Sequence, residues 1–172
     1  SRLVLDCNRE LDAPGVLPIA SDGHAVPGNA LEDDAREARL ARFFRPYHDH
    51  IAATIATARP AMILSLHSFT PSLAAHPDQE RPWHVGVLYN EDDRLAGAAI
   101  AALEAEGLNV GDQQPYSGKL LNATMNRHAE ANVIPYVGIE MRQDLVGETA
   151  GQALFAERLA RMCQKVTLNI GA

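Results

Sequence analysis

The chain has 172 residues, of which 47% are hydrophobic and 22% are charged, a composition typical of one globular domain that excludes a disordered chain or a coiled coil. The formal net charge of −7 does not favour nucleic acid or an anionic membrane surface as a partner. No apolar run approaches the roughly 20 residues that cross a bilayer, and the two cysteines, Cys7 and Cys163, are too few for a disulfide framework. We therefore expect a cytoplasmic protein with no nucleic-acid or membrane partner.

Short apolar runs predict strands, apolar residues that recur on one face predict helices, and stretches rich in Pro, Gly and polar residues predict loops. In chain order, the sequence predicts a strand at 2–8, a loop at 10–30, a helix at 31–57, a strand at 62–66, a loop at 72–82, a strand at 83–89, a helix at 92–106, a loop at 109–122, a helix at 124–131, a strand at 136–139 and a helix at 149–166. Pro46 is expected to kink or split the first helix, because proline has no backbone N–H.

Strands that alternate with helices predict an α/β fold with a central mixed, largely parallel sheet flanked by helices. The sequence shows no internal repeat and no linker composition, so we expect residues 1–172 to form a single α/β hydrolase domain. The chain opens directly on a predicted strand, with no initiator Met and no signal-peptide pattern. Because a domain rarely starts so abruptly, we expect an N-terminal segment of the full-length protein to be missing from this sequence.

Polar residues follow three of the predicted strands, and ligands of open α/β sheets gather at the carboxyl ends of strands. These residues are Asn8-Arg9, His67-Ser68, and Glu140 with Arg142. Guanidinium groups at this edge suit an acidic substrate. Imidazole is a common zinc ligand, and a carboxylate beside a metal can act as a general base on bound water.

Each of these residues also has a structural interpretation. His67 can be a hydrogen-bonded structural residue, Glu140 can form a salt bridge with Arg142, and Asn8-Arg9 can simply start a turn. The run His48-Asp49-His50 resembles a zinc-binding His-x-His pair, but residues two apart on a helix do not face each other. A structural or supporting role is therefore favoured for His48. Neither a phosphate-binding glycine loop nor a Gly-x-Ser-x-Gly elbow is present in the sequence.

Several short motifs occur in order along nearly the whole chain. They are SRLVLDCNR at 1–9, SDG at 21–23, VPGN at 26–29, RPYH at 45–48, SLHSFTP at 65–71, RPWHVGVL at 81–88, PYSG at 115–118, RH at 127–128 and IEMRQDL at 139–145. Each motif is weak alone, but together they are specific, and the sequence resembles the N-formylglutamate amidohydrolase family.

That family looks like a relative of the zinc carboxypeptidases and of the aspartoacylase and succinylglutamate desuccinylase group. The resemblance therefore implies a phosphorylase/hydrolase-like, zinc-carboxypeptidase-like fold and a zinc cofactor. It places His67 as a zinc ligand and Glu140 as the catalytic glutamate, with the other ligands expected upstream of Ser1, because no His-x-x-Glu occurs in the sequence. The residues that it implies for substrate binding are Asn8, Arg9, Arg142, Tyr116 and His128, with His48 supporting the site.

The function that the resemblance implies is hydrolysis of an N-acyl acidic amino acid, most directly N-formyl-L-glutamate to formate and L-glutamate, a reaction of amino-acid catabolism and histidine degradation. The expected partner is a small anionic N-acyl amino acid, and the expected assembly is a monomer or homodimer. Two alternatives stay open: a related metallo-deacylase or carboxypeptidase-like peptidase on another acyl amino acid or peptide, and an inactive, metal-free binding remnant of the fold.

Overall fold

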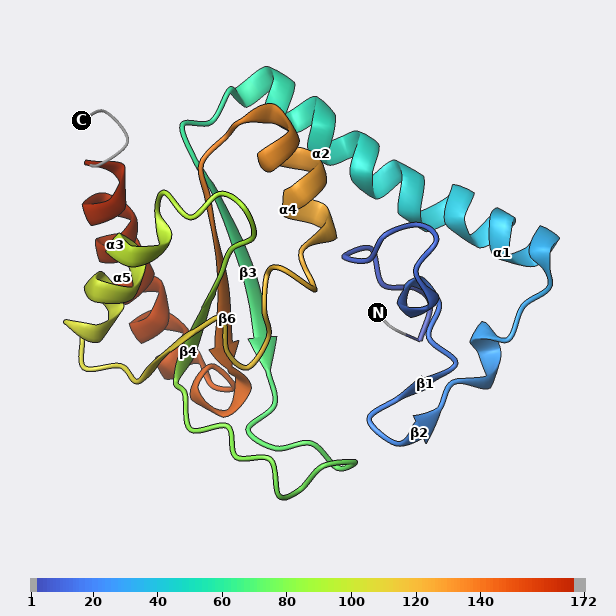
Figure 1. The fold of residues 1–172 in the computed structure, drawn as a ribbon, viewed down its shortest axis with the longest axis horizontal. Coiled ribbons are helices and arrows are strands. Elements are labelled where there is room, and N and C mark those ends of the chain that lie inside the picture. Colours follow the sequence, from blue (N-terminus) through green and yellow to red (C-terminus); the bar gives the residue numbers. More distant parts are fainter. Residues whose placement is uncertain (1–2, 169–172) are drawn as a thin grey trace.

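A four-stranded sheet forms the centre of the molecule (Figure 1), whose computed structural model describes residues 3–168. Its strands lie in the order β3 (Ile63–Phe69), β6 (Tyr136–Arg142), β4 (Val85–Leu88) and β5 (Val110–Asp112). The pairs β3–β6 and β4–β5 are parallel, whereas β4–β6 is antiparallel. The predicted α/β class and the mixed, mostly parallel sheet are therefore confirmed.

The main hydrophobic core lies between the sheet and two helices, α3 (Ala96–Glu104) and α5 (Thr149–Thr167). Among its fully buried side chains are Val85, Val87, Leu103, Val137, Ile139, Met162 and Val166. Burial of each such side chain contributes about 1.5–3 kcal/mol to stability before the entropy of ordering it. Because side chains alternate along a strand, β6 directs Val137 and Ile139 into this core and Glu140 to the other face of the sheet.

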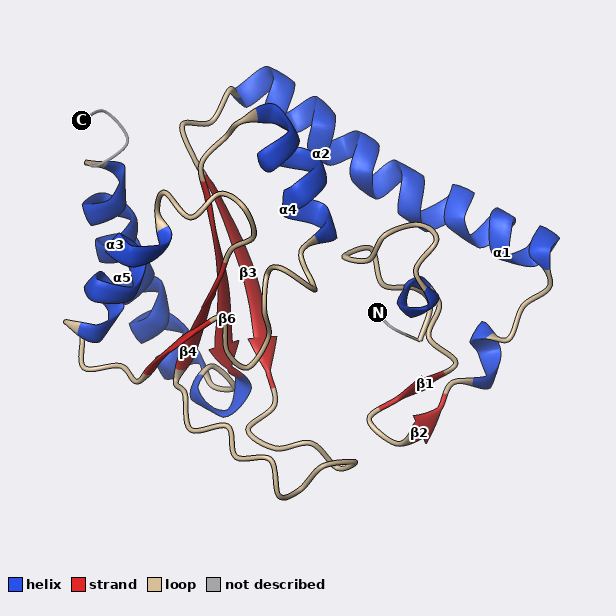
Figure 2. Ribbon diagram, viewed as in Figure 1, coloured by secondary structure: helices blue, strands red, loops and turns tan. Residues whose placement is uncertain are grey.

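The N-terminal segment lies on the other side of β3 from α3 and α5, and a long helix joins it to the sheet (Figures 1 and 2). This helix consists of α1 (Asp33–Arg39), a π-helical turn (Leu40–Phe44) and α2 (Arg45–Ala58). In the π turn the Arg45 N–H donates to the Leu40 carbonyl. The helix predicted at 31–57 is thus present, and the widened turn directly before Pro46 accommodates the lost donor without splitting the helix.

The strand predicted at 2–8 is wrong for the residues that the structure describes, and Arg2 lies outside them. Residues 3–8 form turns, in which the Asp6 N–H donates to the Val16 carbonyl. Leu3 is 70% exposed, whereas Leu5 is buried. Leu5 packs in a small cluster, which we call the N-terminal cluster and which consists of Leu5, Val16, Leu17, Leu40 and Phe44. The apolar run therefore anchors one leucine in this cluster and does not enter a β-ladder.

Two loops predicted from their Pro, Gly and polar content contain short strands. Residues 10–30 hold the hairpin of β1 (Ala20–Ser21) and β2 (His24–Ala25), and residues 109–122 hold β5. Strands of two or three residues give no measurable alternation, so their sequences could not be distinguished from loops.

Two strands extend further than their apolar runs. The parallel ladder pairs His67 with Glu140 and Phe69 with Arg142, so His67 and Glu140 lie inside β3 and β6 and not beyond their ends. Backbone groups make the ladder, and polar side chains therefore do not end it. Two helices are shorter than predicted, namely α3 and α4 (Ala123–His128). Within residues 3–168 no helix has the length and apolar character to cross a membrane.

Candidate active site

A cleft of about 720 Å³ lies between the N-terminal segment and the sheet. Its lining comes from the N-terminal turns, the β1–β2 hairpin, α2, the carboxyl half of β3 and the loop after it, the middle of β6 and the loop after β5. The polar side chains among its lining residues are Asp6, Asn8, Arg9, Ser21, Asp22, Tyr47, His67, Ser68, Thr70, Tyr116 and Glu140. Five of the residues predicted for the site, His67, Glu140, Asn8, Arg9 and Tyr116, therefore line one cleft.

Glu140 and His67 are neighbours across the β3–β6 ladder and both line the cleft. Glu140 is only 8% exposed. The imidazole of His67 reaches solvent, but the surrounding protein atoms displace part of its hydration and lower the pKa of His67, against a smaller opposite effect of Asp6. His67 is therefore neutral at neutral pH, next to a carboxylate that is shielded from bulk water.

Asn8 and Arg9 are held in a turn by Asp6. One Asp6 carboxylate oxygen accepts from the Asn8 backbone N–H at 3.0 Å, and the other lies 3.3 Å from Nε of Arg9. The Asn8 side-chain oxygen accepts from the Thr124 N–H at 3.0 Å. This bond fixes the orientation of the Asn8 amide, whose Nδ2 is a donor that can serve a ligand. The pair thus both forms a turn and presents donors to the cleft.

His48 and His128 lie behind the cleft wall and do not line the cleft. Both are 4% exposed, with Nδ1 of His48 2.8 Å from Nε2 of His128. Nε2 of His48 lies 3.1 Å from the carbonyl oxygen of Cys7. A carbonyl only accepts, so Nε2 of His48 carries the proton, and neutral His48 accepts at Nδ1 from Nε2–H of His128.

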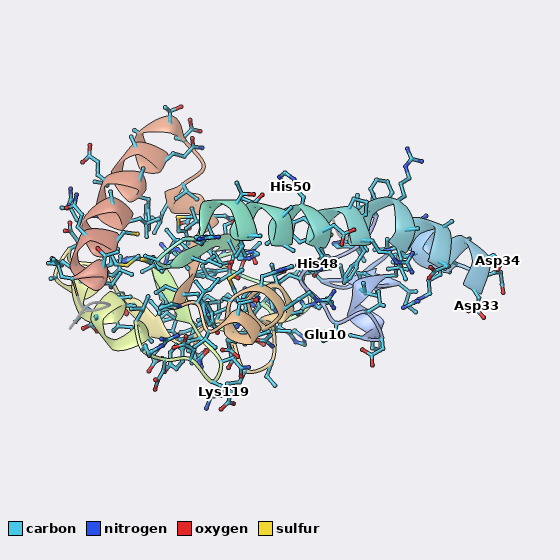
Figure 3. The ribbon with its side chains drawn as sticks, turned by 90° about the horizontal axis from the view of Figure 1, so that it is seen from above. Glu10, Asp33, Asp34, His48, His50 and Lys119 are labelled. Atoms are coloured by element: carbon cyan, nitrogen blue, oxygen red, sulfur yellow. The ribbon has the colours of Figure 1, made fainter. Side chains whose placement is uncertain are left out.

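Burial lowers the pKa of His48 to about 4, with smaller contributions from Arg127 and His128. Burial also lowers the pKa of His128. His50, two residues further along α2, is exposed and points away from His48 (Figure 3). The two histidines of the His-x-His run thus face different surroundings, and His48 connects α2 and α4 to the turn that carries Asn8.

Arg142 ends β6, and its Nε donates to the carboxylate of Asp144 at 2.8 Å. It is absent from the lining of the cleft. Of the residues predicted to bind substrate, Arg142 and His128 are therefore the two that the fold does not place at the cleft surface.

The sequence motifs gave no role to two residues that the structure brings to this region. Asp22 lines the cleft, and its carboxylate accepts from the backbone N–H groups of Ala75 at 2.9 Å and Ala74 at 3.1 Å. Asp22-Gly23 is a strong hairpin signal that could have indicated the β1–β2 turn. The second residue is Arg81, whose buried guanidinium contacts the cleft wall through Tyr116 and Thr70; no sequence signal predicts that burial.

The side chains of the cleft match only part of a site for the zinc that the resemblance implies. His67 fits one zinc ligand, since its imidazole is neutral and faces the cleft. Zinc sites take at least three protein ligands, and residues 3–168 contain no group of three or more His, Cys, Asp and Glu side chains placed to hold a metal ion. The described residues alone therefore do not fit a zinc site, and no chemical step below depends on a metal.

The fold and the cleft define an α/β protein whose site combines a shielded carboxylate with donors suited to a small anionic ligand. Residues 1–146 match the family model of N-formylglutamate amidohydrolase, and the chain belongs to this family. Family membership supports a hydrolase that acts on an amide.

Two crystal structures resemble the chain. A gene product of Agrobacterium tumefaciens is 32% identical with a TM-score of 0.90, and the match covers 100% of this chain and 69% of that one. The N-formylglutamate amidohydrolase of Ralstonia eutropha shares the fold at 18% identity and a TM-score of 0.66, over 98% of this chain and 73% of that one. The sequence matches no curated protein.

Proposed function

We propose that the protein hydrolyses N-formyl-L-glutamate to formate and L-glutamate. The observation that carries the proposal is the buried carboxylate of Glu140, which lines the same cleft as the donors of Asn8 and Arg9. Membership of the family supports hydrolysis of an amide, and the name of the Ralstonia eutropha protein supports the formylglutamate substrate.

Glu140 acts as general base and then as general acid. The oxygen of a water molecule bonds to the formyl carbon while Glu140 removes a proton from that water. The bond between the formyl carbon and the amide nitrogen then breaks, and Glu140 returns the proton to the leaving nitrogen. Glu140 ends the cycle ionised, as it began, and the products are formate and the amino acid.

Arg9 and Asn8 hold a carboxylate of the substrate. A guanidinium can form two parallel hydrogen bonds with a carboxylate, which fixes both its position and its orientation. Nδ2 of Asn8 adds a donor, and the Thr124 N–H, which donates to the amide oxygen, fixes the orientation of the side chain. Asp6 limits the freedom of both residues and so orders the donors before substrate arrives.

Zinc dependence is part of the same proposal, with His67 as one ligand of the ion and the remaining ligands expected outside the described residues. The related alternatives, a metallo-deacylase for another acyl amino acid and a metal-free binding protein, differ in what the same cleft does with its ligand. Activity and metal content therefore have to be measured together.

The test is release of formate from N-formyl-L-glutamate by the purified protein, before and after exhaustive chelation and again after zinc is returned. We expect formate release, its loss on chelation, its recovery with zinc, and about one zinc per chain by elemental analysis. Full activity after chelation would overturn the zinc dependence alone. Saturable binding of N-formyl-L-glutamate without release of formate would overturn the hydrolase and support the binding protein.

A further inference from the structure

Arg81 is a buried cation that no carboxylate neutralises within residues 3–168. It is 6% exposed. Its Nη1 donates to the carbonyl oxygen of Thr70 at 3.3 Å and to the hydroxyl oxygen of Tyr116 at 3.2 Å, and its Nε is buried without a hydrogen-bond partner. The guanidinium carbon lies 5.2 Å from the centre of the Tyr116 ring. These hydrogen bonds and this ring contact are all with neutral groups.

A charge in this position is unfavourable unless an anion joins it. Removing a cation from water costs several kcal/mol, and hydrogen bonds to neutral acceptors offset only part of that cost. Arginine does not lose its proton in a protein, so the site cannot avoid the charge by titration. Both contacts of Arg81, Thr70 and Tyr116, line the cleft, so an anion bound there would lie close to the guanidinium.

The direction of the hydrogen bond fixes the role of Tyr116. Arginine has no acceptor, so the hydroxyl oxygen of Tyr116 accepts from Arg81 and its own hydrogen points elsewhere. Among residues 3–168 no group accepts that hydrogen. The hydroxyl of Thr70, on the same wall, is buried and also without a partner. The hydroxyl of Tyr116, backed by a guanidinium, thus remains as a donor for a ligand in the cleft.

We propose that Arg81 is a positioning residue that makes this wall, formed by Thr70, Arg81 and Tyr116, a recognition site for the second carboxylate of a dicarboxylic substrate. The proposal rests on the proposed function, whose substrate has two carboxylates. Arg9 recognises one of them. Because Arg142 is bound to Asp144 outside the cleft lining, the hydroxyl of Tyr116 recognises the other, and Arg81 holds that hydroxyl in place and supplies the charge.

The test compares three substrates with the full-length chain. N-formyl-L-glutamate has both carboxylates, N-formyl-L-glutamine lacks the side-chain carboxylate, and N-formyl-L-glutamic acid α-amide lacks the α-carboxylate. We expect Tyr116→Phe to lower kcat/KM for N-formyl-L-glutamate by about 10- to 100-fold, mainly through KM, as for a lost hydrogen bond to a charged group. Tyr116→Phe should cause no such loss with one of the two amide substrates, namely the one that lacks the carboxylate recognised by Tyr116. Equal losses with all three substrates would overturn the proposal.

Tyr89→Phe is the matched control, because its hydroxyl donates to Asp112 on the exposed surface, at 2.9 Å, and is absent from the cleft lining. Arg81→Met is expected to reproduce the Tyr116→Phe pattern of substrate preference, and the double variant to lose no more than the more affected single variant. Arg81→Lys keeps the charge and should retain more of that preference than Arg81→Met. Because Tyr116→Phe keeps the ring that packs against Arg81 and removes only the hydroxyl, it decides the proposal even if Arg81→Met does not fold.

Binding of glutarate by calorimetry separates this proposal from the proposed function. If the wild-type protein hydrolyses none of the substrates, the proposed function fails. Weaker glutarate binding by Tyr116→Phe, with unchanged binding by Tyr89→Phe, would then still support the carboxylate wall. Equal glutarate affinity of wild type, Tyr116→Phe and Arg81→Met would overturn it.

Discussion

The N-terminal segment together with the first part of the long helix, residues 3–44, and the sheet body, residues 63–167, are stabilised in different ways. The sheet body buries fourteen core residues against α3 and α5, whereas the N-terminal cluster has five. The cleft takes Glu140 from the sheet body and Asn8 and Arg9 from the N-terminal segment. The group proposed for chemistry thus lies on the firmly packed side, and the groups proposed for recognition lie on the side with the smaller core.

Polar contacts compensate for part of this difference. The guanidinium of Arg39 donates to the carbonyl oxygens of Val4 and Gly28 and to the side chain of Asn29. Two further contacts, of Asn8 with Thr124 and of His48 with the Cys7 carbonyl, connect the segment to α4 and α2. Local opening is most frequent where few apolar contacts hold a segment, so we expect residues 3–30 to exchange amide protons before the sheet body does.

The largest expected effect is on the sheet side of the cleft. Glu140→Gln keeps the size of the side chain but cannot accept a proton from water. We expect kcat to fall by roughly 10²–10⁴-fold, the usual contribution of a positioned acid–base group, measured as formate release under saturating substrate. Glu106→Gln is the control, since Glu106 pairs with Arg161 outside the cleft lining. Near-normal kcat with a lowered melting temperature would assign Glu140 a structural role.

Truncation of one core residue on each side compares the two regions directly. Ile139→Ala removes a fully buried side chain of the main core and should lower the free energy of unfolding by about 2–5 kcal/mol in urea titrations. Leu5→Ala removes an anchor of the N-terminal cluster. We expect it to raise KM and speed amide exchange in residues 3–30, with a smaller change in global unfolding.

The reverse result would contradict the comparison. If Leu5→Ala lowers global stability as much as Ile139→Ala, the N-terminal cluster and the main core unfold as one cooperative unit, and the proposed difference between the regions is wrong.

The buried histidine pair makes the link between the regions sensitive to acid. Folding lowers the pKa of His48 from 6.5 to about 4. Above pH 6.5 the imidazole is neutral in both the folded and the unfolded chain, so its protonation does not reduce the free energy of unfolding there. As the pH falls below that value, the unfolded chain binds a proton that the folded chain excludes, and stability decreases by about 1.4 kcal/mol per unit, up to roughly 3 kcal/mol near pH 4.

Urea midpoints measured between pH 7 and pH 4 check this linkage. His48→Asn should be less stable than wild type at pH 7 and should lose part of the pH dependence, whereas the exposed His50→Asn should keep it. An unchanged slope in His48→Asn would show that other groups cause the acid sensitivity.

The same contrast explains how much of the fold could be predicted from the sequence. The helix predicted at 149–166 matches α5, because a long apolar stripe specifies a helix that covers a sheet. The run Leu3-Val4-Leu5 has the composition of a strand, but a strand also needs a neighbouring backbone, and here the chain folds back on Val16. That partner is set by tertiary structure, which a short apolar run does not encode.

The sequence motifs predicted five residues that line the cleft, two on the sheet and three on turns or loops. His67 and Glu140 come from apolar strands and lie next to each other in the ladder. The motif at 139–145 predicts Arg142 as a substrate-binding residue. In the structure its guanidinium donates a hydrogen bond to Asp144, two residues further along the chain. The burial of Arg81 arises from packing against Thr70, 11 residues earlier, and Tyr116, 35 residues later. Composition and spacing therefore could not predict it.

The smallest expected effect comes from a substitution of Arg9, on the N-terminal side of the cleft. Arg9→Lys keeps the positive charge near Asp6 but loses the planar pair of donors that matches a carboxylate. We expect kcat/KM for N-formyl-L-glutamate to fall by an amount equivalent to about 1–3 kcal/mol, as for a charged hydrogen bond left unmade. Removing the carboxylate that Arg9 contacts should cost the wild-type enzyme about as much, and the variant little more. The losses from two changes that remove the same interaction do not add, whereas the losses from two independent interactions do. Additive losses would therefore show that Arg9 does not contact that carboxylate, and that its role in the N-terminal segment is to order the turn through Asp6.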